Sequence, residues 1–239
     1  MATQQLEMTH VGKIVAEQPG VARIFEKHKI DYCCQGATTL IDACKRKKVD
    51  LTQVMDEIRQ VVSLQNKHDE TDWTAAPLAE LVRNIVDTHH NFLRTELPRI
   101  SALVAKVNKV HGENHSELAE VASTFEAMRA ELESHMLKEE RVLFPAIDMM
   151  EVRQIAGSFP FGSVANPIDM MELEHDEVGA ALRKLRELTG DFTPSPEACT
   201  TWRVMLEALE NLEQDIHQHI HKENNILFPR AIELEAAVR

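Results

Sequence analysis

The sequence predicts an all-α protein in which a small helical N-terminal domain precedes an up-down four-helix bundle. Composition is the first indication. The 239 residues include only 8 glycines, 9 prolines and 5% aromatic residues, while leucine, alanine, glutamate, lysine and methionine are abundant, which favours long helices over sheet. The second indication is a series of four long amphipathic segments in the later part of the chain. The third is a motif with helical spacing that occurs twice.

The predicted N-terminal domain covers residues 1–64 and consists of short helices separated by turn signals. A polar stretch over residues 65–76 is expected to link it to the bundle. The cysteines Cys33 and Cys34 lie in a turn between the second and third of these helices. The predicted helices cover residues 11–18, 21–28, 40–47 and 52–62.

The predicted bundle covers residues 77–239 and is built as two copies of a helix pair. Its longest break, residues 157–167, falls between the two pairs. The four helices are expected at about residues 77–110, 115–150, 167–189 and 196–236.

Prolines mark three expected irregularities in these helices. Pro196, with Ser195 before it as a cap, fits the start of the fourth helix. Pro145 and Pro229 lie inside apolar patterns, so we expect each to kink or end its helix.

The charge balance excludes some classes of partner. The chain has 26 basic and 39 acidic residues and a formal net charge of −13, which argues against binding to nucleic acid or to an anionic membrane. No stretch approaches the ~18 apolar residues of a membrane span, and the N-terminus lacks a signal pattern. We therefore expect a cytoplasmic protein. In that reducing compartment its four cysteines are not expected to form a disulfide framework.

The repeated motif predicts a metal site. His-x-x-Lys-Glu-x-x-x-Leu-Phe-Pro begins at His135 and again at His219. In each copy the histidine and the glutamate, Glu139 or Glu223, are four residues apart and share one helix face. Such a mixture of nitrogen and oxygen donors suits iron or manganese better than a structural zinc site.

The other two helices are expected to add one histidine each. His175 lies on the apolar stripe of the third helix. On the first helix His90 fits better than the adjacent His89, because leucines follow it at +3 and +7. On the fourth helix His217 and His221 form a pair of their own, but only His219 and Glu223 repeat the motif.

The predicted metal ligands are therefore four histidines and two glutamates, which fit a dinuclear iron centre with room for an oxo bridge or a small ligand. Taken singly, each histidine would more often be an ordinary core or surface residue, and it is the duplication that favours a metal site. Glu140 and Glu174 adjoin ligands and could support them, but a solvated acidic face is the favoured interpretation. The set is His90, His135, Glu139, His175, His219 and Glu223.

The adjacent cysteines are a poor structural disulfide, because their side chains diverge along the backbone. If Cys33 and Cys34 are exposed in their turn, they could be partly ionised and act in metal binding or redox chemistry. The alternative is two small buried residues.

These motifs together resemble a known family. The segment from Asp31 to Gly36, with the paired cysteines, and the His/Glu motifs of the bundle resemble the iron-sulfur cluster repair di-iron proteins of the YtfE/ScdA type. The C-terminal part is similar to hemerythrin-like domains. The resemblance covers nearly the whole chain. It places the family's metal ligands on the six residues above, with bridging by Glu139 and Glu223, and implies a role for the paired cysteines.

The resemblance implies a cytoplasmic stress protein with two oxo-bridged non-haem iron ions per chain. Its expected partners are iron-sulfur proteins damaged by nitric oxide or peroxide. Donation of iron is the first hypothesis. The alternative is an enzyme that reduces nitric oxide or nitrite at the same centre, and an oxygen carrier or sensor ranks third. A homodimer is also expected, because a small helical domain on a polar linker buries little surface by itself.

Overall fold

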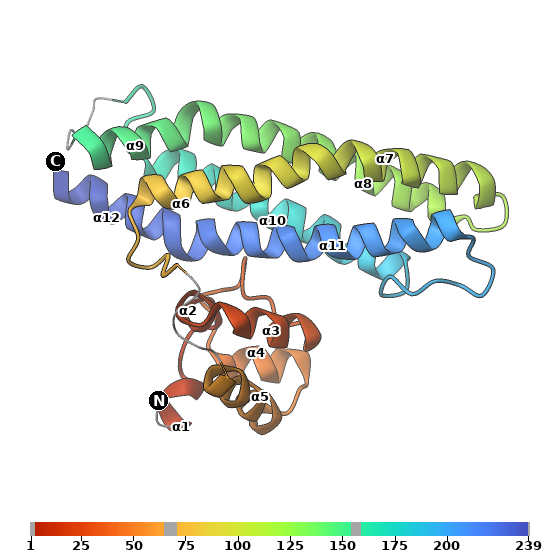
Figure 1. Ribbon diagram of the computed structural model, residues 1–239, viewed down its shortest axis with the longest axis horizontal. Helices are drawn as coiled ribbons and strands as arrows, with labels where there is room; N and C mark the ends of the chain where they lie inside the picture. Colours follow the sequence, from red (N-terminus) through yellow and green to blue (C-terminus); the bar gives the residue numbers. More distant parts are fainter. Residues whose placement is uncertain (1–2, 65–70, 154–158, 239) are drawn as a thin grey trace. The chain divides into compact units, whose positions relative to one another are not determined.

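The computed structural model describes residues 3–64, 71–153 and 159–238. They form two compact units: unit 1 joins Met1–Val82 to His217–Arg239, and unit 2 is Arg83–Ile216. In the described ranges the chain is helical and has no strands, which confirms the predicted all-α class (Figure 1). The predicted domain boundaries stay predictions. Residues 65–70 of the expected linker and residues 157 and 158 of the expected break lie outside the described residues.

The N-terminal part of unit 1 contains the four predicted short helices within a few residues of their expected ends. Apolar side chains from all of them, including the fully buried Phe25, Leu40 and Val54, form one core. Its elements are α1 (Thr3–Glu7), α2 (Val11–Glu17), the 3-10 turn η1 (Pro19–Val21), α3 (Ala22–Lys27), α4 (Leu40–Lys47) and α5 (Leu51–Leu64). α6 (Leu78–Ile85) follows.

The ends of α4 show why the chain turns there. Thr39 precedes the helix, and its hydroxyl accepts a hydrogen bond of 3.3 Å from the backbone N–H of Asp42, which satisfies one of the N–H groups that a helix start leaves without a partner. Lys48 ends the helix in the left-handed conformation, at φ 57°. The loop before α4, which carries the paired cysteines, is thus followed by a well-defined helix start.

The C-terminal part of unit 1 is the end of α11 (Thr200–Lys222), the π-helical turn η4 (Glu223–Leu227) and α12 (Phe228–Val238). The turn η4 packs against α2. The Arg230 guanidinium donates hydrogen bonds to the carbonyls of Trp73, at 2.7 Å, and Ala76, at 2.6 Å. These contacts bring the two ends of the sequence together inside unit 1.

Unit 2 holds the long helices. α8 packs against both α7 and α10, and apolar residues three or four positions apart line their buried faces. A charged pair also joins α10 to α11, because the Arg186 guanidinium donates to both carboxylate oxygens of Glu213. The elements are η2 (Val86–His90), α7 (Asn91–His111), α8 (Glu117–Lys138), η3 (Glu139–Leu143), α9 (Phe144–Arg153), α10 (Ala165–Leu188) and the first part of α11.

One expectation about the prolines was wrong. The fourth helix begins at Thr200 rather than at Pro196, which lies in a turn, and the buried Ser195 hydroxyl has no hydrogen-bond partner among the described residues. Pro145 and Pro229 lie where an α-helix gives way to a π-helical turn and a new helix begins, which agrees with the interruption expected at each of them. Each is the second residue of a new α-helix that directly follows a π-helical turn.

The π turns explain how the prolines fit. A proline ring clashes with the carbonyl of the residue four positions earlier and lacks an N–H for it. Widening the turn to an i+5 pattern moves that carbonyl away. The turns η3 and η4 precede Pro145 and Pro229, whereas the turn η2 is followed by Asn91 and Phe92 rather than by a proline.

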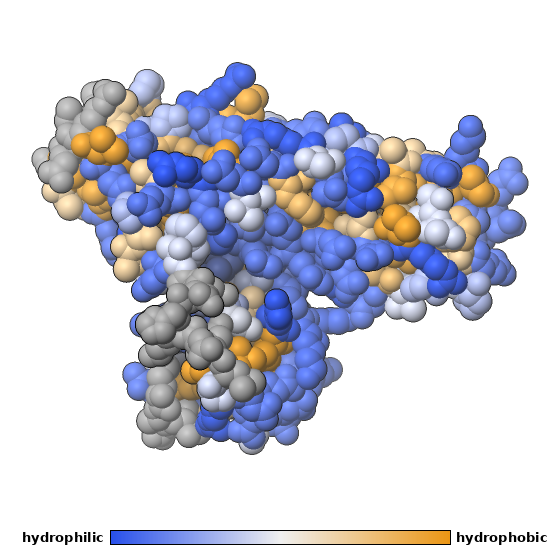
Figure 2. Space-filling model, in the orientation of Figure 1, coloured by the Kyte–Doolittle hydropathy of each residue, from blue (hydrophilic) through white to orange (hydrophobic). Residues whose placement is uncertain are grey.

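The surface is mainly polar on the face that can be seen. Hydrophilic residues cover most of the face that Figure 2 shows, and hydrophobic ones appear in scattered groups. None of the described helices is long and apolar enough to cross a membrane.

Candidate metal centre

Three of the six predicted ligands lie at the ends of π turns. His90 is the last residue of η2, Glu139 is the first of η3, and Glu223 is the first of η4. Isolated π turns inside α-helices are rare and occur frequently at functional sites. Each turn shifts the register of its helix by one residue at the position where a donor is presented.

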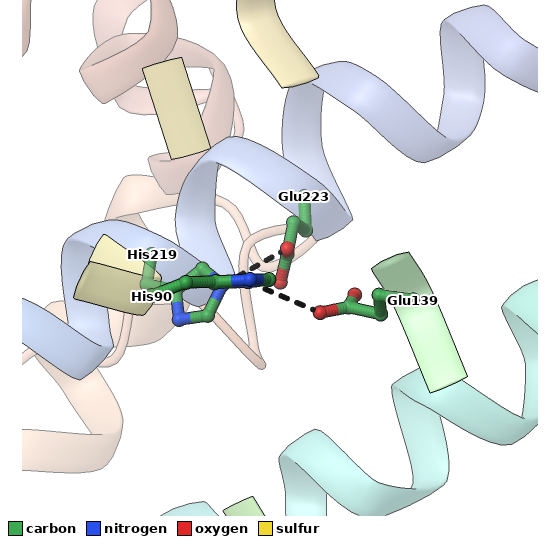
Figure 3. Close-up of side chains that lie close together, drawn as sticks. All are labelled: His90, Glu139, His219 and Glu223. Carbon is green, nitrogen blue, oxygen red and sulfur yellow. Dashed lines mark hydrogen bonds and ion pairs between the residues drawn. The ribbon is translucent and has the colours of Figure 1, made fainter. Parts of the chain in front are cut away.

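In unit 2, four predicted ligands converge around one carboxylate. Glu139 Oε2 lies 3.4 Å from His90 Nε2 and 3.3 Å from His135 Nε2 (Figure 3 shows the first pair). His175 Nε2 is 3.1 Å from His135 Nε2. Two nitrogens bound at right angles to one metal ion at about 2.1 Å would be about 3.0 Å apart, so the spacing of these imidazoles suits a shared cation.

All four side chains are deeply buried. The exposed fraction is 0% for His90 and Glu139 and 2% for His135 and His175. Burying an ionised carboxylate is costly unless a cation or strong hydrogen bonds compensate it. The donor chemistry and the burial therefore both fit a bound metal ion.

Unit 1 contributes the second copy of the motif. His219 Nε2 lies 3.0 Å from Glu223 Oε1, one helical turn further along the chain (Figure 3). Their exposed fractions are 1% and 0%. This pair is as buried as its counterpart in unit 2.

Two further glutamates hold the outer nitrogens of the unit 2 histidines. His90 Nδ1 donates to Glu140 Oε1 at 2.6 Å, and Arg94 binds the same carboxylate. Although burial raises its pKa, the hydrogen bonds from His90 and Arg94 bring the pKa of Glu140 below its usual value. A carboxylate at Nδ1 fixes the tautomer in which Nε2 presents its lone pair.

The same arrangement recurs at the second histidine. His135 Nδ1 donates to Glu174 Oε2 at 2.9 Å, and Lys138 forms an ion pair with the other carboxylate oxygen. The hydrogen bond from His135 is the main reason that the pKa of Glu174 falls to about 2, against the effect of burial. The favoured interpretation of Glu140 and Glu174 as a solvated acidic face is therefore wrong.

We predict that Glu140→Ala and Glu174→Ala each weaken iron binding by roughly 10- to 100-fold, because a histidine without its carboxylate partner is less basic and less well oriented. Competition with a chelator measures this affinity. Glu133→Ala, at an exposed glutamate that lies on the same helix as His135 and pairs with Arg129, is the matched control. If Glu140→Ala and Glu174→Ala both kept the wild-type affinity, and all the metal-free proteins were equally stable, these two glutamates would not support the metal ligands.

The histidines that sequence analysis set aside contact other groups. His89 Nδ1 lies 2.9 Å from Asp215 Oδ1. His217 Nδ1 lies 2.9 Å from Glu26 Oε1, and the His221 ring packs edge-on against Tyr32, with centroids 5.4 Å apart. Burial lowers the pKa of His221 to about 4. Within unit 1, His217 and His221 thus contact residues of the N-terminal helices and their loop.

The paired cysteines differ from expectation in exposure. Cys33 is buried, with 4% exposed, and Cys34 is half-buried. Their Sγ atoms are 3.8 Å apart, so no disulfide joins them. A hydrogen bond with Cys34, together with burial, raises the pKa of the Cys33 thiol. The expectation of two exposed and partly ionised thiols is therefore wrong for Cys33.

One side chain of the π turn η4 holds the cysteine loop. Asn225 Nδ2 donates to the carbonyls of Cys33, at 3.0 Å, and Tyr32, at 3.3 Å. Its Oδ1 sits against Gly12 and Gly36, where an added Cβ would lie only 2.2 Å and 2.0 Å from that oxygen. Sequence analysis missed this contact, although the two glycines were a signal of close approach.

Comparison with known proteins extends across both units. The model of the hemerythrin HHE cation binding domain matches residues 81–231. A domain of unknown function named ScdA_N matches residues 7–62. The iron-sulfur cluster repair protein YtfE of Citrobacter koseri is 38% identical over 222 residues, which cover 93% of this chain and 96% of that protein. The same figures hold for proteins of that name from Escherichia coli and Escherichia fergusonii.

Proposed function

This chain belongs to the hemerythrin-like family of iron-sulfur cluster repair proteins of the YtfE type, and from that membership we propose that it repairs damaged iron-sulfur clusters by donating iron. The buried convergence of His90 and His135 on the Glu139 carboxylate carries the proposal. Its partners would then be the proteins that carry the damaged iron-sulfur clusters, and it would act under nitrosative or oxidative stress.

We propose that all six predicted ligands bind two iron ions, with an oxo bridge between them when both are ferric. The sequence repeat supports the pairing of His219 and Glu223 with His135 and Glu139, and the family model matches one continuous stretch that contains all six. Nitrogen and oxygen donors suit iron, whereas a structural zinc site favours thiolates and closes at four ligands. Bound iron supplies the cargo for repair.

The charge of the ligand set favours release of one ion. Four neutral imidazoles and two carboxylates carry a net charge of −2, which one ferrous ion neutralises. A second ferrous ion leaves two uncompensated positive charges in a buried site, where charge is costly. The neighbouring Glu140 and Glu174 do not offset them, because each is already paired with Arg94 or Lys138. One iron can therefore leave while the other keeps the site together.

Transfer to an acceptor tests this function. Iron-57-loaded protein is incubated anaerobically with cluster-free aconitase, sulfide and a ferrous chelator that traps dissolved iron. We expect up to about one iron per chain to reach the acceptor and restore its cluster, while the same amount of dissolved iron is captured by the chelator. Failure of the loaded protein to restore any cluster would overturn the proposal.

The other hypotheses have less support. Reduction of nitric oxide or nitrite at the same centre is not favoured, because the relatives are named for cluster repair. Oxygen carriage leaves the N-terminal domain and its cysteines without a role. A homodimer, a cytoplasmic location and nitric oxide or oxygen as small ligands stay predictions.

A further inference from the structure

Three donor atoms that are not among the six ligands already described meet in the N-terminal loop of unit 1. Asp31, Cys33 and Cys34 each offer a ligand atom, and these atoms lie within 4.8 Å of one another. Cys33 Sγ is 3.4 Å from Asp31 Oδ1 and 3.8 Å from Cys34 Sγ. Two thiols and a carboxylate are a recognised set of donors for divalent metal ions.

Two of the three spacings between these atoms match tetrahedral coordination. Two thiolates bound at about 2.3 Å and at a tetrahedral angle would be about 3.8 Å apart, which is the distance between Cys33 Sγ and Cys34 Sγ. A thiolate and a carboxylate oxygen bound at about 2.1 Å would be about 3.6 Å apart, close to the 3.4 Å between Cys33 and Asp31. Little movement is needed to admit an ion.

The loop is already held in this conformation by its own contacts. Asp31 Oδ1 accepts hydrogen bonds from the backbone N–H groups of Cys34, at 3.0 Å, and Gln35, at 3.2 Å. The Cys33 thiol also points at Asp31 Oδ1, and an ion bound there would take the place of the thiol proton. On the other side, Asn225 holds the carbonyls of Tyr32 and Cys33. A site ordered before binding avoids most of the entropy cost of assembling it.

We propose that Asp31, Cys33 and Cys34 form a second metal site, which takes one divalent cation in tetrahedral coordination and leaves the fourth position open. The geometry of the site does not depend on the proposed repair function. The identification of the ion as ferrous iron on its way to an acceptor does rest on that function. An open fourth position would accept a thiolate from an acceptor protein, which a closed four-ligand site could not do.

The binding step is a ligand exchange without electron transfer. Two S–H bonds break, two metal–sulfur bonds form, and two protons pass to the solvent. The metal keeps its oxidation state, so no oxidant or reductant is needed. Metal binding supplies the free energy that ionises the buried Cys33 thiol.

The turn that carries Glu223 also anchors this site. Asn225 lies two residues after Glu223 in the π turn η4, and its side chain binds the loop through Tyr32 and Cys33. Within unit 1, a proposed ligand of the iron centre and the proposed thiol site are thus joined through one side chain. This arrangement gives the N-terminal domain a part in handling the iron.

Cobalt titration of the iron-loaded full-length protein tests the site. Under anaerobic conditions we expect one cobalt ion to bind per chain with the intense visible bands of tetrahedral thiolate coordination, and two protons to be released. Cys33→Ser and Cys34→Ser should each weaken cobalt binding by roughly 100-fold or more. That is a larger loss than is expected when a residue that only contacts a metal ligand is changed. Asp31→Asn should weaken it less and shift the bands. Cys199→Ser, at an exposed cysteine, is the matched control.

The outcomes separate this proposal from the proposed function. Absence of thiolate bands in the wild-type protein, their survival in a Cys33→Ser/Cys34→Ser double variant, or their loss in Cys199→Ser would overturn the second site. Because Cys34 is only half-buried, Cys34→Ser keeps the test valid if Cys33→Ser fails to fold. If iron reached aconitase but no cobalt–thiolate signal appeared, the second metal site would be rejected and the repair function would remain. A normal cobalt signal without iron transfer would remove the repair function and leave the site standing.

Discussion

Glu139→Gln protein is expected to lose most of its iron, and its affinity for iron should fall by at least roughly 100-fold. Changing a residue that only contacts a ligand should cost less than this. The amide keeps the size of the side chain but removes the negative charge that His90 and His135 face. Without that charge, the remaining glutamate of the ligand set cannot neutralise even one ferrous ion. Iron per chain after anaerobic loading and desalting measures the effect.

The neighbouring residue provides the control for this variant. Glu140→Gln alters a half-buried glutamate that binds His90 from its other side, so it should retain more iron than Glu139→Gln. Glu139→Leu should cost metal as well, because it removes the same carboxylate. Full iron retention in a folded Glu139→Gln protein would remove Glu139 from the ligand set.

Gly36→Ala is expected to lower the free energy of unfolding of unit 1 by about 1–3 kcal/mol, the usual cost of overpacking. The new Cβ would lie 2.0 Å from Asn225 Oδ1 and 2.8 Å from its Cγ. Gly36 does not adopt a positive φ, so the cost is steric rather than a matter of backbone strain. Chemical denaturation followed by circular dichroism measures it.

A double-mutant cycle isolates the contact with Asn225. Asn225→Ala removes the oxygen that the new methyl group would meet, so Gly36→Ala should cost much less in that background. Asn225→Ala alone should destabilise the loop by about 0.5–1.5 kcal/mol per hydrogen bond lost. An equal cost of Gly36→Ala in both backgrounds would show that the close approach to Asn225 does not limit this position.

The helices and the two close His/Glu pairs could be predicted from the sequence because both depend on local spacing. The apolar stripe that passes through His175 needs only helical periodicity, and the structure buries that residue in the same stripe. The π turns were not accessible. A proline inside an apolar pattern predicts an interruption, but whether the helix ends, kinks or widens depends on which packing lets the following segment, such as α9, continue.

Contacts between distant segments were also beyond the sequence. Glu140 and Glu174 resemble surface residues because their partners, His90 and His135, come from other helices. Asn225 is an ordinary polar residue within its own turn, and its role depends on carbonyls more than 190 positions away. Local patterns identify which side chains can bind a metal, whereas packing decides what orients them.

The iron content and the Mössbauer spectrum of protein loaded with iron-57 test the central claim most directly. If the six residues hold a di-iron centre, we expect about two irons per chain in a bundle of this type. The spectrum should be that of a coupled ferric pair after oxidation and of two ferrous ions after reduction. A single isolated iron, or zinc as the only metal retained, would contradict it.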